Sequence, residues 1–579
     1  MLVCNGVTGD SRVQKTARSA AEAGWEVTLL GRSPDGRAAS WWIGGAQVRL
    51  LPVPTPLERP PRTARRPLLS GPLAYRPGTA AYRTRLVQAW RDELRTRRAA
   101  LAAADPGGGA LARGRRAARL ALPRAAARLA RRWVGFRTRQ LDKGVGRRAA
   151  GTLADRAAVV LWQRVLRERC WRGLWPGLYD FELAYGRVVD ELRPDLIHAH
   201  DFRMLGVGAR AKIRAAAEGR AVKLVWDAHE FLPGVRPWHN DVRWLPAHLA
   251  HEAEYAPYAD AAVTVSAGLA ALLRRRHGLR ADPVVVLNAP EARATRGDPD
   301  EKVPGLRALC GIGPDVPLVV YSGAAAPQRG LGTMVEALPR LPGVHTALVV
   351  PKPAAGYPKQ LRERAARLGV AERLHILPYV PYQQVVPFLA EADAGAIPLH
   401  HWPNHEIALI TKFFEYAHAR LPLVVSDVET MAATTRETGQ GEVFRAEDTA
   451  DYVRAVRAVL ADPERYRAAY ARPGLLERWT WEAQAHTLDA LYTGLLHDRP
   501  DRPDRPDRSA RPARAGRAQE PDRTDQPEGD GNADLCGGAR EDRAATGRAV
   551  RGQGAPGDGR GHRRARGRER QRGPGTVPG

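Results

Sequence analysis

The stretch NHEIALITKFFEYAHARLPLVVSD, residues 404–427, places a helical pattern directly before a buried strand. Lys412 and Glu415 are three residues apart, so they share one face at the start of this helix. A helix N-terminus offers free N–H groups and a positive dipole to a phosphate, and Lys412 adds a cation. Glu415, one turn deeper, is placed to accept hydrogen bonds from two ribose hydroxyls. The same spacing also suits a surface Lys–Glu pair, so spacing alone leaves both interpretations open.

Strands and helices alternate on both sides of this stretch. Apolar runs of strand length suit parallel sheets that are covered on both faces by helices. Such runs lie at 25–31, 46–53, 195–200, 223–229, 261–266, 283–288, 317–323, 345–351, 373–379, 394–399 and 421–427. The pattern predicts an α/β protein with two Rossmann-like, doubly wound domains facing across a cleft, in which ligands bind beyond the carboxyl ends of the strands.

The expected domain boundaries follow from shifts in composition. A Pro/Gly/Asp-rich linker separates two α/β series, and an Arg/Ala-rich helical insertion interrupts the first. A final helix is expected to return to the N-terminal domain, and the tail has too few apolar residues to offset the entropy of ordering, which predicts disorder. The expected parts are an N-terminal domain at 1–290 with its insertion at 56–175, a linker at 291–305, a C-terminal domain at 306–478, the final helix at 479–496 and the tail at 497–579.

The net charge of +27 is concentrated in one segment. Residues 51–150 hold 24 Arg and Lys against 5 Asp and Glu. This distribution argues against a nucleic-acid-binding surface over the whole protein, and the basic segment has few interleaved aromatic residues, so no nucleic-acid partner is expected. No apolar run reaches membrane-spanning length, and no secretory signal pattern is visible. These features predict a cytoplasmic protein.

One helix of the basic segment is amphipathic. Over 122–139, an apolar side carries Leu122, Leu129, Trp133 and Phe136, and arginines lie opposite. This pattern is expected of a helix that lies on an anionic membrane, which would place residues 110–140 on the inner face of the plasma membrane. It also suits a helix whose apolar side packs on the sheet domain while its arginines are solvated, and both interpretations remain open.

Five motifs, in chain order, resemble the retaining glycosyltransferases of family 4, which have the GT-B fold. They are CNGVTGDSRVQK (4–15), WDAHEFLPG (226–234), YSGAAAPQRGLGTMVEAL (321–338), ADAGAIPL (392–399) and the opening stretch. The resemblance covers roughly residues 1–55 and 178–495. Family members usually have a longer first strand, so the true start of the chain is expected upstream of Met1.

The resemblance implies transfer of a sugar from a nucleoside-diphosphate sugar, with retention of anomeric configuration. Glu415 would hold the nucleotide ribose, and Lys412 with Arg329 would neutralise the diphosphate leaving group. Negative charge grows on that group in the transition state, so cations there accelerate the reaction. Gly323 and Gly330 would let the backbone approach the donor closely.

On the other side of the cleft, the resemblance places His229 beside the donor sugar, near the anomeric carbon. The residues expected on the acceptor side are Gly6, Asp10, Arg12, His200, Asp201, Asp227 and Glu230. Asp10 is expected to cap the first helix, and Arg12 with Lys15 either lines the mouth of the cleft or faces water.

The chain departs from the family pattern at the donor site. Many members carry two glutamates eight residues apart, but Ile407 stands eight residues before Glu415 and Glu406 stands nine before it. Either the loop is shifted by one residue and Glu406 contacts the sugar, or Asn404 or a backbone amide does so. Ala324 also follows Gly323 where many members have arginine.

No metal or other cofactor is expected, and the one Asp-x-Asp motif, at 298–300, lies in the linker as a solvated turn. The function that fits best is a glycosyltransferase acting on a glycan, a lipid-linked acceptor or a small molecule, in the synthesis of a polysaccharide, glycolipid or other glycoconjugate. A nucleotide-sugar epimerase on the same fold, and a catalytically inactive membrane or nucleic-acid adaptor, are the alternatives.

Overall fold

The computed structural model describes residues 1–57, 75, 79–104, 114–115, 118, 120–138, 153–235, 241–292, 304–354 and 356–497. The tail expected at 497–579 therefore lies, after His497, outside the described residues, as does the Asp-x-Asp motif at 298–300. Among the described helices, none is long and apolar enough to cross a membrane.

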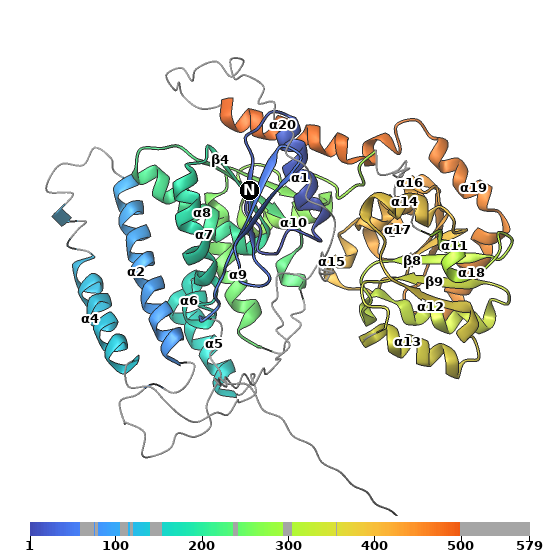
Figure 1. Cartoon of the computed structure of the whole chain (residues 1–579), viewed down its shortest axis with the longest axis horizontal. Helices are drawn as coiled ribbons and strands as arrows, with labels where there is room; N and C mark the ends of the chain where they lie inside the picture. Colours follow the sequence, from blue (N-terminus) through green and yellow to red (C-terminus); the bar gives the residue numbers. More distant parts are fainter. Residues whose placement is uncertain are drawn as a thin grey trace, which may run out of the picture. The chain divides into compact units, whose positions relative to one another are not determined.

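The N-terminal half is built on a mostly parallel sheet (Figure 1). One group of strands has the order β1-β3-β2, and the other has the order β4-β5-β6-β7. Leu2 bridges Leu30 on one side and Ala199 on the other, so the first residues of the chain join the two groups. The strands are β1 (Thr28–Arg32), β2 (Ala39–Ile43), β3 (Ala46–Leu51), β4 (Leu196–His200), β5 (Lys223–Ala228), β6 (Ala261–Thr264) and β7 (Val284–Val285).

Helices cover both faces of this sheet because its strands are apolar runs that cannot face water. The helices α1 (Ser11–Glu22), α8 (Asp201–Ala217) and α10 (Ala267–His277) contact the strands directly. Around them, α7 (Leu178–Leu192) and α9 (Trp244–Tyr255) pack on α8, and α6 (Trp171–Leu174) packs on α9. Asp10 caps α1 by accepting a hydrogen bond from the N–H of Val13, which confirms the expected cap.

The described part of the insertion is helical and is attached to α8 by buried charges. It contains α2 (Thr79–Ala103), α4 (Ala121–Thr138) and α5 (Leu153–Leu166). Arg210 of α8 is 2% exposed and donates to Asp92 and Glu93 of α2 at 2.7 and 2.6 Å. Asp92 and Glu93, two of the few acidic residues in this basic segment, thus attach it to the domain through Arg210.

The amphipathic helix leaves its larger apolar side chains exposed, which decides against one of the two interpretations left open by the sequence. α4 packs on α2 through small side chains, of which Ala127 is 2% and Val134 7% exposed. The four larger apolar side chains stay in solvent, with exposures of 82% for Leu122, 69% for Leu129, 49% for Trp133 and 37% for Phe136. The interpretation in which this side packs on the sheet domain is therefore wrong. The side of α4 that packs is the one with Ala127 and Val134, because these small side chains let α4 approach α2 closely.

The C-terminal half contains a six-stranded parallel sheet of order β10-β9-β8-β11-β12-β13. This is a doubly wound sheet whose order reverses between β8 and β11, where ligands bind in such folds. The strands are β8 (Leu318–Ser322), β9 (His345–Val349), β10 (Leu374–Leu377), β11 (Ala394–Ile397), β12 (Leu423–Ser426) and β13 (Gly441–Phe444). The helices are α11 (Leu306–Cys310), α12 (Leu331–Ala337), α13 (Gly356–Arg367), α14 (Val385–Leu389), α15 (Pro403–Glu406), α16 (Thr411–His418), α17 (Glu429–Thr438), α18 (Thr449–Ala461) and α19 (Pro463–Arg467).

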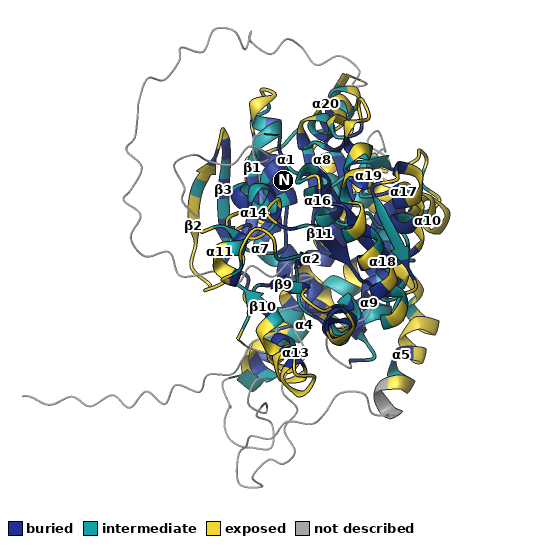
Figure 2. Ribbon diagram, turned by 90° about the vertical axis from the view of Figure 1, so that its right-hand side faces the viewer, coloured by how far each residue is buried: buried dark blue, intermediate teal, exposed yellow. Residues whose placement is uncertain are grey.

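The last described helix, α20 (Trp481–His497), packs on α1 of the N-terminal half. Its Trp481, Leu488 and Tyr492 are buried in one cluster with the first residues of the chain. Figure 2 shows that the buried residues concentrate in the sheets and in the helix faces turned toward them. This helix thus returns to residues 287–290, which follow β7 and lead to the second sheet, and its Trp481 and Gln484 form hydrogen bonds with them.

Candidate functional site

The expected site residues gather at the carboxyl ends of the parallel strands. His200 is the last residue of β4, and Asp227 lies one residue before the end of β5. Gly323 follows β8, and the loop after β11 leads into α15 and α16. This is the edge at which open α/β sheets bind their ligands.

Asp227 is the centre of a buried charge cluster on the N-terminal side. It is 1% exposed, and both of its oxygens accept hydrogen bonds from Arg12, from Nε and Nη2 at 2.9 Å each. Three imidazoles surround its Oδ2, from His198, His200 and His229 at 3.3 to 3.4 Å. Burial raises the pKa of Asp227, but the charges of Arg12 and His229 outweigh it and hold the pKa well below the ordinary value. Asp227 is therefore a stable buried anion.

The three imidazoles differ in charge and access. Burial lowers the pKa of His198 and His200, both of which are fully enclosed, so these two rings are neutral. Burial also lowers the pKa of His229, but the charge of Asp227 more than compensates and the net pKa is raised. The side chain of His229 is 26% exposed, so among these three it is the ring that a substrate can reach.

Arg12 and Lys15 do not face water. Both residues are 4% exposed, because α1 turns this side of the helix toward β5 and the segment after β7. The alternative in which they face water is therefore wrong, and Arg12 binds the carboxylate of Asp227.

Two carboxyl groups lie beside His229. Burial raises the pKa of Asp201, and burial together with the neighbouring Asp201 raises the pKa of Glu230 to about 8. Asp201 also has a positive φ of 68°, and its Oδ1 accepts from the N–H of Phe202 at 2.7 Å. A non-glycine residue in this conformation is strained, and such strain concentrates at functional sites. A protonated Glu230 could donate a hydrogen bond to an acceptor oxygen.

The loop before α1 is fixed by its own polar contacts. Asn5 donates from Nδ2 to Asp10 Oδ2 at 2.8 Å, and Val7 takes a positive φ of 70°. A Cβ atom on Gly6 would meet only ordinary contacts, the nearest at 3.7 Å. Packing therefore does not require glycine at position 6, and its expected role toward a sugar stays a prediction.

Two glycines on the C-terminal side are required, Gly330 by a clash with backbone and Gly323 by its positive φ. A Cβ on Gly330 would lie 1.6 Å from the carbonyl oxygen of Pro398, and a Cβ on Gly323 would lie 2.4 Å from Lys412 Nζ. Both have positive φ, of 74° and 140°. The ammonium of Lys412 thus lies directly on the backbone of Gly323, and 5.3 Å from the ring centre of Tyr321.

Lys412 and Glu415 form one electrostatic unit with Arg329. Burial lowers the pKa of Lys412, the charge of Arg329 lowers it further, and the charge of Glu415 opposes both. Burial raises the pKa of Glu415, against the charges of Lys412 and Lys15. Two cations and one carboxylate thus lie close together beside the start of α16, so an anion would restore the full charge of Lys412.

Glu406 and Asn404 are engaged in holding loops. Glu406 binds His401 Nδ1 through Oε1 at 2.7 Å and accepts the N–H of Glu429 through Oε2 at 2.8 Å. Asn404 accepts from the N–H of Phe231 at 2.8 Å and donates to its carbonyl at 3.1 Å. Since these side chains are committed to their neighbours, the structure favours positioning roles for both over direct contact with a sugar.

Sequence reasoning missed two residues of this loop region, His401 and Asp427. His401 Nε2 also lies 3.0 Å from Asp427 Oδ1, so one imidazole bridges two carboxylates after adjacent strands. The pair His400–His401 at a strand end was the available signal.

His198, His200 and Asp227 also have the composition of a metal site. Their potential ligand atoms lie within 4.8 Å of one another. However, both oxygens of Asp227 already bind the guanidinium of Arg12. A cation would have to displace Arg12, so this cluster is poorly suited to a metal.

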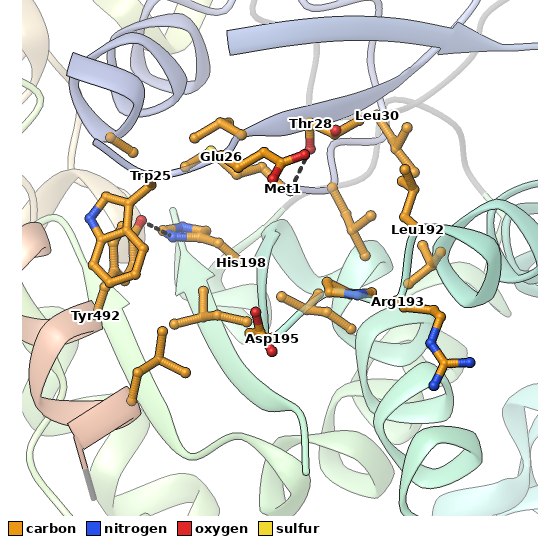
Figure 3. A pocket seen from close by; sticks show the side chains of 18 of the residues that line it. Met1, Trp25, Glu26, Thr28, Leu30, Leu192, Arg193, Asp195, His198 and Tyr492 are labelled. Carbon is orange, nitrogen blue, oxygen red and sulfur yellow. Dashed lines mark hydrogen bonds between the residues drawn. The ribbon is translucent and has the colours of Figure 1, made fainter. Parts of the chain in front are cut away.

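A cavity of about 610 Å³ lies at the opposite, amino-terminal end of the strands (Figure 3). It is lined by Met1, Thr28, Asp195 and the α20 residue Tyr492. His198 forms its connection to the site, because His198 Nδ1 is 2.6 Å from Tyr492 Oη while His198 Nε2 faces Asp227. His198 thus lies between this cavity and the buried charge cluster around Asp227.

Comparisons with known proteins agree with this arrangement. Residues 144–289 match the family described as Glycosyltransferase Family 4, and residues 308–472 match Glycosyl transferases group 1. The D-inositol 3-phosphate glycosyltransferase of Nocardia farcinica is 29% identical over 249 residues, which are 39% of this chain and 54% of that protein. The protein of the same name from Geodermatophilus obscurus is 28% identical over 313 residues, or 52% and 66% of the two chains. The chain thus spans between about half and two thirds of these two relatives.

Two solved structures share the fold. Sucrose-phosphate synthase from Thermosynechococcus elongatus superposes with a TM-score of 0.53 at 16% identity, over 86% of this chain and 99% of that one. The α,α-trehalose 6-phosphate synthase of Burkholderia multivorans gives 0.50 at 13% identity, over 86% and 98%. At these identities the likeness concerns the fold alone, and it confirms the prediction of two Rossmann-like domains.

Proposed function

Because the chain belongs to the GT-B glycosyltransferases of family 4, we propose that it transfers a sugar from a nucleoside-diphosphate sugar to an acceptor hydroxyl with retention of configuration. The observation that carries this proposal is the group formed by Lys412, Arg329 and Glu415 over Gly323 and Gly330. A diphosphate would be bound by these two cations, by the backbone at the two glycines and by the free N–H groups at the start of α16. The carboxylate of Glu415, one turn further along the helix, would accept hydrogen bonds from the ribose hydroxyls.

In the proposed reaction the bond between the anomeric carbon and the diphosphate oxygen breaks, and its electron pair stays on the diphosphate. Lys412 and Arg329 stabilise the charge that develops there. The acceptor oxygen attacks the same face of the sugar, and its proton passes to the departing phosphate oxygen. His229, charged and oriented by Asp227, contacts the sugar near the reacting carbon.

The test measures release of nucleoside diphosphate from a panel of nucleotide sugars. The panel is combined with acceptors that include inositol 3-phosphate, because relatives carry that substrate in their names. We expect release with one donor that depends on an acceptor. Glu415→Ala should weaken binding of that donor about tenfold or more, since hydrogen bonds to a charged group are worth about 1.5–3 kcal/mol.

The same panel separates the alternatives. An epimerase would change the sugar without releasing nucleoside diphosphate, and an adaptor would bind no donor. Unchanged donor affinity in Glu415→Ala would show that the site is placed wrongly.

We further propose that α4 lies on an anionic membrane surface at the inner face of the plasma membrane, where a lipid-linked acceptor would be reached. Its support is the exposed apolar stripe of Leu122, Leu129, Trp133 and Phe136, which is flanked by the arginines of the same helix. Trp133 and Phe136 stack at 5.8 Å between ring centres. Apolar side chains flanked by arginines are the design of interfacial helices.

Flotation with vesicles tests this surface. The protein should float with vesicles that contain anionic phospholipid and not with neutral ones. The double variant Leu129→Glu, Trp133→Glu should lose flotation, whereas Trp42→Glu, which changes an exposed aromatic residue of β2, should retain it. Equal flotation of the double variant and the wild type would reject the membrane surface.

A further inference from the structure

The first helix directs two buried basic side chains at the segment that connects the two sheets. Arg12 and Lys15 lie about one turn apart on α1, and each is 4% exposed. Lysine and arginine are almost never this buried unless they are paired, because an unpaired buried charge is costly. Arg12 has its carboxylate in Asp227, but the ammonium of Lys15 forms no ion pair with a side chain among the described contacts.

Lys15 instead binds the connecting segment itself. Its Nζ donates to Asn288 Oδ1 at 3.0 Å and to the carbonyl of Ala289 at 2.5 Å, and it lies 4.7 Å from the ring centre of Trp481. Arg12 adds a bond from Nη1 to the carbonyl of Val286 at 2.7 Å. The two cations of α1 therefore hold the chain at both ends of a four-residue stretch just after β7.

Helix α20 holds the same segment from its other side. The N–H of Leu287 donates to Gln484 Oε1 at 2.9 Å, and the N–H of Trp481 donates to the carbonyl of Pro290 at 2.7 Å. Residues 286–290 are therefore fixed by both helices and cannot act as a free linker.

Asn288 connects this fixed segment to α16, the helix that carries Lys412 and Glu415. Its Nδ2 donates to Thr411 Oγ1 at 2.8 Å, while its Oδ1 accepts from Lys15. Thr411 is the first residue of α16, and Lys412 follows it directly. A single amide side chain thus connects the cation of α1 to the helix that carries Lys412 and Glu415.

We propose that Lys15 is a positioning residue for the donor site, which fixes the start of α16 through Asn288 and Thr411. The role in donor binding rests on the proposed function, whereas the mechanical link to α16 does not. In this role Lys15 contacts neither donor nor acceptor. It sets the place of Lys412 and Glu415 from the opposite half of the chain.

The first test is a mutant cycle on nucleotide affinity, using UDP, GDP or ADP, whichever the wild type binds tightest. Lys15→Met should weaken that affinity about tenfold, which is within the usual range of coupling between sites. Asn288→Ala should cause a similar loss, and the double variant should lose little more, because both changes break the same connection. Lys15→Arg, which keeps a cation, should be milder, and Lys212→Met, which removes a lysine of α8 remote from this segment, should have no effect.

The second test is amide hydrogen exchange in the free protein, which needs no nucleotide. Lys15→Met and Asn288→Ala should each speed exchange at residues 413–418 of α16, and Lys212→Met should not. Absence of nucleotide binding by the wild type would count against the proposed function alone. Additive losses of affinity in the double variant, or unchanged exchange in α16, would overturn the role of Lys15.

Discussion

Gly330→Ala is expected to destabilise the C-terminal half by more than about 3 kcal/mol, a size found where a mutation forces a severe clash or strain. A Cβ at this position would lie 1.6 Å from the carbonyl oxygen of Pro398, which is backbone and cannot rotate away. Gly330 also has a φ of 74°, a conformation that costs roughly 1–2 kcal/mol for a residue with a side chain. Since Pro398 directly follows β11, the displaced backbone belongs to the donor site, and donor binding should fall with stability.

Gly343→Ala separates strain from clash. Gly343 has nearly the same φ, 76°, but a Cβ there would meet nothing within 4 Å. This variant should therefore lose only the roughly 1–2 kcal/mol of conformational cost. Urea unfolding of both variants measures the difference, and equal losses would show that the approach of Pro398 is not required.

The sheets could be predicted from the sequence because parallel strands buried on both faces must be apolar. The strands β8, β9 and β12 fall inside the runs 317–323, 345–351 and 421–427. β2 and β13 were not predicted, since β2 is largely exposed and antiparallel and β13 is a short run with half-buried positions. The apolar pattern of a strand reflects its burial, so strands that are only slightly buried are not detected from the sequence.

The candidate site was only partly predictable, and the limit is sequence distance. Lys412 and Glu415 could be identified because helical spacing places them together. The pairs Arg12–Asp227 and Asn404–Phe231 are separated by 215 and 173 residues, and spacing carries no information about them. The same limit explains why the contacts of Arg12 with Asp227 and of Asn404 with Phe231 were not predicted.

Lys412→Met is expected to lower the rate of sugar transfer by about 10²–10³-fold, the usual effect of removing one group that stabilises developing negative charge. Methionine keeps an unbranched side chain that is one atom shorter, so the change removes the ammonium over Gly323 and keeps most of the apolar stem. Lys359→Met, which removes an exposed lysine of α13, is the matched control and should retain full activity. The measurement is kcat and KM for the donor identified in the panel, with thermal unfolding to establish that both variants fold.

A pH series adds a second signature of Lys412. Burial and Arg329 lower its pKa, so the ammonium loses its proton at a lower pH than an exposed lysine. Its charge is present below that pKa and disappears as the pH rises through it, so donor affinity of the wild type should fall between about pH 6 and about pH 9. Lys412→Met should bind weakly with a flatter profile, because the group that titrates is gone. A wild-type rate in Lys412→Met, or an identical pH profile, would remove Lys412 from the diphosphate site and leave Arg329 as its cation.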